Sequence, residues 1–83
     1  MRKTLWSRGY GLLVELLADV REEQGLNQRQ LAELLKKPRS YVSKVERGER
    51  KVDPMECAEW ARACGLTPKM FFVRFARAIE RRQ

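Results

Sequence analysis

The sequence predicts an all-α protein built from five short helices. Apolar residues recur at helical spacing in five segments, and no segment shows the alternating pattern of a β-strand. Glycine or proline separates these segments at positions where helices end or begin. A chain of 83 residues can bury one small core, so we expect a single domain over residues 1–83.

The first predicted helix spans residues 8–24 and follows a short basic arm at residues 1–7. Its apolar positions recur at i, i+3, i+4 and i+7 and therefore share one face, which consists of Leu13, Leu16, Leu17 and Val20. Gly25 follows the last periodic position and is expected to end the helix.

The second predicted helix covers residues 28–35. Asn27 is its expected N-cap, and Gln30 stands three residues later, as a capping box requires. Its expected inner face consists of Leu31, Leu34 and Leu35.

After a turn at Lys36 and Lys37, Pro38 favours the first position of a third helix over residues 38–47. Val42 and Val45 are expected to point inward in this helix.

Two further helices complete the predicted fold. Asp53, Pro54 and Glu56 together form a cap, a proline at the first helical position and a capping acid, which predicts a helix over residues 54–64. Thr67 and a following proline predict the last helix, over residues 68–81. The buried face of the first of these two helices is expected to contain Cys57, Trp60, Ala61 and Cys64.

The composition favours an anionic partner and gives no support for catalysis. The chain has 18 Lys and Arg against 11 Asp and Glu, a net charge of +7 and an isoelectric point of about 10.0, which is typical of nucleic-acid-binding domains. It contains no histidine, no glycine-rich phosphate loop and no nucleophile beside a credible base. We therefore expect no enzyme activity, no cofactor, no metal site and no small-molecule ligand.

The cysteine pattern and the hydropathy both favour a cytoplasmic protein. If its anionic partner is DNA, the bound protein would be associated with the nucleoid. Cys57 and Cys64 are spaced too far apart for a disulfide within one helix, and two free buried thiols suit a reducing compartment. No apolar run approaches the length of a membrane-spanning helix, and no signal peptide opens the chain.

The third predicted helix has the features of a helix that reads bases in the DNA major groove. If Val42 and Val45 point inward, four polar side chains occupy the outer face near its start, and arginine, lysine and serine can all contact base edges. The predicted base-contacting residues are Arg39, Ser40, Ser43 and Lys44. A solvated helix face is the alternative interpretation.

Several other residues are candidates for contacts with the DNA backbone. Gln28 begins the second helix, where the amide groups and the helix dipole favour an anion. Tyr41 is ambiguous, since it could instead pack against the second helix or touch a thymine methyl. The predicted phosphate-contacting residues are Gln28, Lys37, Tyr41, Arg47, Arg50 and Lys51.

Residues 16–66 resemble the helix-turn-helix domain of the lambda-repressor and Cro family, also called the xenobiotic-response-element (XRE) family of bacterial and phage regulators. The matching motifs are Gly25-Leu26-Asn27-Gln28-x-x-Leu31-Ala32, Val42-Ser43-x-Val45-Glu46-x-Gly48 and Ala61-x-Ala63-x-Gly65-Leu66. The resemblance places the helix-turn-helix unit at residues 28–47. It implies a phosphate contact for Gln28, base contacts for Arg39, Ser40 and Lys44, and an ion pair between Arg21 and Glu46.

The turn between the second and third helices departs from the family pattern. Lys36 stands where glycine is usual, which would cost about 1 kcal/mol or more if its backbone is left-handed. Pro38 replaces the usual serine or threonine cap.

The last helix carries more apolar surface than one face of a small domain requires. It could close the core of its own domain or form the seam of a homodimer, as in the similar controller proteins of restriction–modification systems and Cro-like phage regulators. The predicted seam residues are Phe71, Phe72, Phe75 and Ile79.

The sequence thus predicts a transcriptional regulator that binds double-stranded DNA as a homodimer on a pseudo-palindromic operator. An alternative is a protein-interaction module with the same fold, such as an antitoxin or an antiactivator, whose main partner is another protein.

Overall fold

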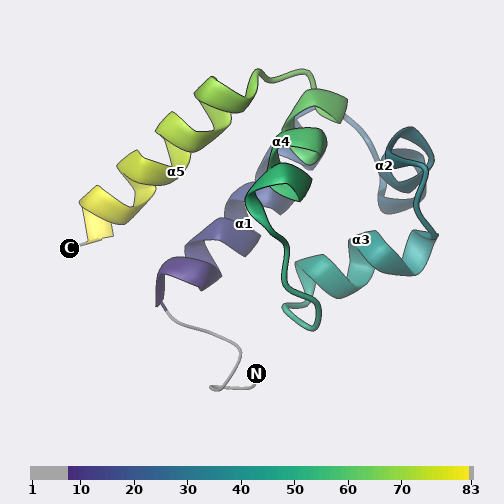
Figure 1. The fold of residues 1–83 in the computed structure, drawn as a ribbon, viewed down its shortest axis with the longest axis horizontal. Helices are drawn as coiled ribbons and strands as arrows, with labels where there is room; N and C mark the ends of the chain where they lie inside the picture. The colour runs from purple at the N-terminus through teal and green to yellow at the C-terminus, as the bar shows by residue number, and fades with distance from the viewer. Residues whose placement is uncertain (1–7, 83) are drawn as a thin grey trace.

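The computed structural model describes residues 8–82, which form five α-helices (Figure 1). The helices are α1 (Arg8–Glu23), α2 (Gln28–Leu35), α3 (Arg39–Glu46), α4 (Pro54–Ala63) and α5 (Pro68–Arg82). The five predicted helices are confirmed, with ends within one residue of the expected positions. Pro38 caps α3 rather than starting it. The predicted basic arm lies outside the described residues. No helix within residues 8–82 is long and apolar enough to cross a membrane.

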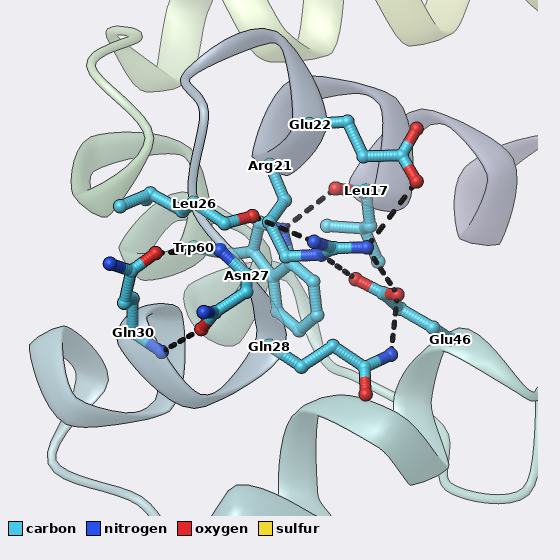
Figure 2. Close-up of polar contacts among 9 residues, drawn as sticks. All are labelled: Leu17, Arg21, Glu22, Leu26, Asn27, Gln28, Gln30, Glu46 and Trp60. Carbon is cyan, nitrogen blue, oxygen red and sulfur yellow. Dashed lines mark hydrogen bonds and ion pairs between the residues drawn. The ribbon is translucent and has the colours of Figure 1, made fainter.

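The core forms where α1 packs against α3, α4 and α5 and where α2 packs against α3 and α4, and Trp60 of α4 is among its fully buried side chains. The Trp60 indole N–H donates a hydrogen bond of 2.9 Å to the carbonyl of Leu17, so burial of the ring leaves no polar group unpaired (Figure 2). Val42 and Val45 of α3 are also fully buried. Because α3 is held through these two valines, its opposite face points away from the protein.

The predicted helix caps are present and set where α2 and α4 begin. The side chain of Asn27 accepts a hydrogen bond from the Gln30 amide at 2.7 Å, and the Gln30 side chain accepts one from the Asn27 amide at 2.8 Å. Asp53 and Glu56 form the equivalent box at α4, with distances of 2.7 and 2.9 Å. Such a box satisfies two amides that would otherwise lack partners.

The turn between α2 and α3 is left-handed at Lys36, with φ 58° and ψ 43°. Lys36 is the only non-glycine residue with positive φ in the described part of the chain. Its amide donates to the carbonyl of Glu33, and the Lys37 amide donates to that of Ala32, so the last turn of α2 is closed in spite of the side chain.

Two expectations about buried leucine and phenylalanine side chains are wrong. Leu34 was expected on the inner face of α2 but is 57% exposed, and Ala32 is buried in its place. Phe71, expected in a dimer seam, has no exposed surface because it belongs to the core cluster. A side chain without exposed surface cannot contact a second subunit.

Helix α5 therefore has both an inner and an outer apolar face. Phe75 packs against the core, and Ile79 is half-buried. The outward apolar residues are Met70, Phe72 and Val73. Arg74 fixes α5 to α1 through two hydrogen bonds of 2.9 and 2.8 Å to the carboxylate of Glu23. The helix thus closes its own core and still leaves an apolar strip uncovered.

Candidate nucleic-acid interface

The outer face of α3 presents Arg39, Ser40 and Lys44 to solvent. The side chains of Arg39 and Lys44 form no hydrogen bond or ion pair with another residue within 8–82. Ser43, also predicted to contact bases, is half-buried, and its hydroxyl accepts a hydrogen bond of 3.1 Å from Arg47. Two cationic side chains and one hydroxyl are consequently free to bind an external group, whereas Ser43 already has a partner.

An ion pair between Arg21 and Glu46 connects α1 to the C-terminal end of α3 (Figure 2). The Arg21 guanidinium contacts both carboxylate oxygens, at 2.6 and 3.1 Å, and donates to the Leu26 carbonyl at 2.7 Å. The two side chains are only 11% and 9% exposed. The hydrogen bond to Glu46 raises the pKa of Arg21 above its ordinary value, so the guanidinium stays charged.

Gln28 joins the same network from the first residue of α2. Its side-chain amide donates a hydrogen bond of 2.9 Å to the Glu46 carboxylate (Figure 2). Glu46 therefore has partners on both α1 and α2, and three helices are linked through one carboxylate. The Gln28 side chain is fixed in place, and its carbonyl oxygen and second N–H are not used by this contact.

A concave surface of about 450 Å³ lies at the N-terminus of α2 and reaches across to α3. The residues around it include three arginines, of which Arg21 is paired with Glu46. The lining residues are Arg21, Asn27, Gln28, Arg29 and Arg39. Positive charge beside a helix N-terminus suits a phosphate group. Arg29 was not among the predicted contacts, although its place in the first turn of α2, next to Gln28, could have indicated it.

Tyr41 lies mostly in the core, with 8% of its surface exposed, and this differs from the expected phosphate contact. Burial raises its pKa to about 12. The centroid of its ring lies 6.3 Å from that of Trp60. Two cations form cation–π contacts with the Tyr41 ring, with Lys37 Nζ at 5.3 Å and Arg50 Cζ at 4.8 Å from the ring centroid. Tyr41 thus holds two predicted phosphate-binding cations in place.

The two arginines that follow α3 are each bound to a carboxylate. Arg47 donates two hydrogen bonds to Glu49, at 3.0 and 3.1 Å, and Arg50 donates two to Glu56, at 3.2 and 3.0 Å. The hydrogen bond from Arg50 also lowers the pKa of Glu56. The Arg47–Glu49 pair is largely exposed, so the Arg47 guanidinium can exchange its carboxylate for a phosphate. The Glu56 side chain is only 18% exposed, so Arg50 is held more firmly. Neither acidic partner was expected from the sequence.

The model of a helix-turn-helix family matches residues 17–71. The chain is 33% identical to an XRE-family-like protein from Pseudomonas syringae pv. tomato. That match covers 84% of this chain and 85% of the other, with a TM-score of 0.79. No protein of curated function matches the chain.

Two further solved structures share the fold at lower identity. One is the restriction–modification controller protein C.Esp1396I, solved as a tetramer in complex with its natural 35 base-pair operator. It is 21% identical, with coverage of 87% and 95% and a TM-score of 0.78. The other is the clp gene regulator ClgR from Corynebacterium glutamicum, at 24% identity, with coverage of 92% and 81% and a TM-score of 0.76.

Proposed function

The chain belongs to the XRE family of helix-turn-helix proteins, which are DNA-binding regulators, and on this premise we propose that it binds operator DNA in a sequence-specific manner to regulate transcription. The observation that carries the proposal is the outer face of α3. Val42 and Val45 bury the inner face of the helix in the core, and Arg39, Ser40 and Lys44 are exposed on its outer face. A short helix held in this way fits the major groove.

In the proposed complex, α3 reads base edges while the residues around it bind the backbone. Arginine and lysine can donate to the acceptors of guanine, and each good contact contributes about 1–3 kcal/mol of discrimination. The proposed base-contacting residues are Arg39, Ser40, Ser43 and Lys44. The proposed backbone contacts are Gln28, Lys37, Arg47, Arg50 and Lys51. The Ser43 hydroxyl accepts a hydrogen bond from Arg47 and donates one of 3.5 Å to the Ser40 carbonyl, which it would give up to donate to a base.

We further propose that the protein acts as a homodimer whose seam includes the outer side of α5. Phe72 and Val73 are exposed there and adjoin the half-buried Phe75 and Ile79. A two-fold axis at this seam would place two copies of α3 about 34 Å apart, on the two halves of a pseudo-palindrome. The C.Esp1396I protein binds its operator as a tetramer, which supports an oligomeric regulator here.

The decisive experiment selects bound fragments from genomic DNA and then measures affinity for the selected site and for a scrambled duplex. We expect Arg39→Ala and Lys44→Ala to reduce the difference between the two duplexes, because they remove base contacts. Gln28→Ala and Lys51→Ala should weaken both complexes about equally. If all four variants weaken the two duplexes by the same factor, α3 does not read bases directly.

A groove beside α2 favours a second candidate function, that of a protein-interaction module. Exposed Leu34 lies in a hollow of about 630 Å³ between the end of α2 and α4, with lysine and arginine around it. The other lining residues are Leu35, Lys36, Lys37, Glu59, Arg62 and Ala63. DNA binding that weakens steeply as salt increases supports the regulator, whereas the absence of DNA binding at low salt supports the module.

A further inference from the structure

Tyr10, which lies outside the helix-turn-helix unit, contacts the loop between α3 and α4 at Lys51 and Val52. Tyr10, near the start of α1, accepts a hydrogen bond of 3.2 Å from the amide of Val52 through its hydroxyl. The Nζ atom of Lys51 lies 5.5 Å from the centroid of the same ring. One side chain therefore contacts both the backbone and a cation of this loop.

Tyr10 is itself well placed by the core. It lies on α1, is half-buried and packs against the core cluster. Burial raises its pKa above the ordinary value of 10.0, so the hydroxyl is neutral at physiological pH. The neutral hydroxyl can accept the Val52 hydrogen bond.

A second tyrosine holds the neighbouring residue of the loop. The Arg50 guanidinium forms a cation–π contact with the ring of Tyr41. It also donates a hydrogen bond of 2.7 Å to the carbonyl of Lys51. Three consecutive residues, Arg50, Lys51 and Val52, are thus attached to two rings that belong to α1 and α3. Cations ordered before binding lose less conformational freedom when they contact a ligand.

We propose that Tyr10 is a positioning residue for DNA binding, which orders the loop so that Lys51 meets the phosphate backbone. This inference rests on the proposed function. Since backbone contacts carry no base information, Tyr10 acts on affinity for every sequence alike. Its effect passes through Lys51 and the loop, and not through the reading helix.

The test is a double-mutant cycle between Tyr10 and Lys51, measured by fluorescence anisotropy on operator and scrambled duplexes at several salt concentrations. The variants are Tyr10→Leu, Lys51→Gln and the two combined. We expect each single variant to weaken both duplexes by about three- to tenfold, and the double variant to be no weaker than Lys51→Gln alone. Lys51→Gln should also reduce the salt slope by about 1.

Lys69→Gln is the matched control, because it removes one exposed lysine from α5 and changes the net charge equally. In the variant that combines Lys69→Gln with Tyr10→Leu, the fold-losses of DNA affinity caused by the two substitutions should multiply. If the effects of Tyr10→Leu and Lys51→Gln also multiply, Tyr10 does not act through Lys51 and the inference is wrong. If the unmodified protein shows no salt-dependent DNA binding, the proposed function itself fails, which is a separate result.

Circular dichroism of each variant shows whether the fold persists at the temperature of the assay. Should Tyr10→Leu not fold, Tyr10→Phe provides the test, since it keeps the ring and removes the acceptor for Val52. Tyr10→Phe should weaken both duplexes by about two- to threefold through loss of one hydrogen bond. Unchanged affinity in this variant would then overturn the inference.

Discussion

Lys36 adopts a left-handed backbone conformation, which a residue with a side chain disfavours. It has φ 58° at the end of α2, where glycine would be unstrained. The family resemblance indicated an unusual turn here, and the structure shows that the chain keeps the usual left-handed geometry without the usual glycine. The sequence pattern identified Lys36 as the position where a left-handed backbone would be costly, but it did not establish that conformation, and it could not show that Lys36 would line a groove with Leu34.

We predict that Lys36→Gly stabilises the protein. Relief of the left-handed strain contributes about 1 kcal/mol or more, and the greater freedom of glycine in the unfolded chain offsets part of it, so the net gain is about 0.5–1 kcal/mol. Urea denaturation measures this change. Lys37→Gly is the matched control and should destabilise the protein, because Lys37 has no positive φ. Destabilisation of similar size in both variants would contradict the argument.

The two thiols are predicted to be unreactive in the native protein. Cys57 and Cys64 are free and buried, and burial raises the pKa of each to about 11. Because the unfolded state ionises first, their contribution to stability is fully present below about pH 9 and is lost as the pH rises toward 11. Labelling with a disulfide reagent at pH 8 should be slow until denaturant is added. Fast labelling of the native protein would show that the thiols are accessible.

At the scale of helices, local patterns predicted where each element begins but not what covers every face. Asn27 and Asp53 cap their helices as expected, since a capping box depends only on residues three apart. Leu34 was misassigned because helical periodicity shows which residues share one face of a helix, but not how much of that face the neighbouring helices cover. Phe71 was misassigned for the opposite reason, since α5 had no identifiable partner in the sequence and in fact packs on α1 and α4.

The Arg21–Glu46 pair should orient α3 more than it stabilises the fold. Glu46→Ala leaves Arg21 without its main partner in a largely buried place, which should cost about 2–3 kcal/mol. The double variant Arg21→Met with Glu46→Leu should recover most of that stability, yet bind operator DNA about three- to tenfold more weakly, because Gln28 has lost its anchor. Thermal unfolding and anisotropy measure the two effects. Full recovery of DNA binding in the double variant would show that the network does not position Gln28.

Glu49 pairs with Arg47, one of the proposed phosphate contacts, and should compete with phosphate for its guanidinium. Glu49→Gln removes the charge that holds the guanidinium, so we expect about two- to fivefold tighter binding to operator and scrambled duplexes at low salt. Glu80→Gln on α5 makes the same change in net charge and is the control. If both variants bind more tightly by the same factor, the effect is one of overall charge and not of Arg47.

For the molecule as a whole, the outward side of α3 could be predicted from the sequence, but the long-range contacts that support it could not. The inward positions of Val42 and Val45 identify the outer face of α3 from sequence alone. The contact between Tyr10 and Val52 joins residues 42 positions apart, and no local pattern indicates such a pair. The same holds for Arg74 and Glu23, which are 51 positions apart. The sequence therefore predicts which side of α3 faces outward, whereas only the fold shows which residues hold the proposed binding surface in place.

The proposed dimer makes a prediction that separates the seam from the DNA-binding face. Each subunit carries a net charge of +7, so added salt should weaken repulsion between subunits and favour the dimer, while the same salt weakens binding to DNA. Phe72→Glu should give a monomer in sedimentation equilibrium at tens of micromolar and should lose the cooperative step in operator binding. Met55→Glu is the control, because Met55 is 67% exposed on α4 and lies outside the proposed seam. If both variants sediment like the unmodified protein, or if the unmodified protein is a monomer with and without DNA, the outer side of α5 is not a dimer seam.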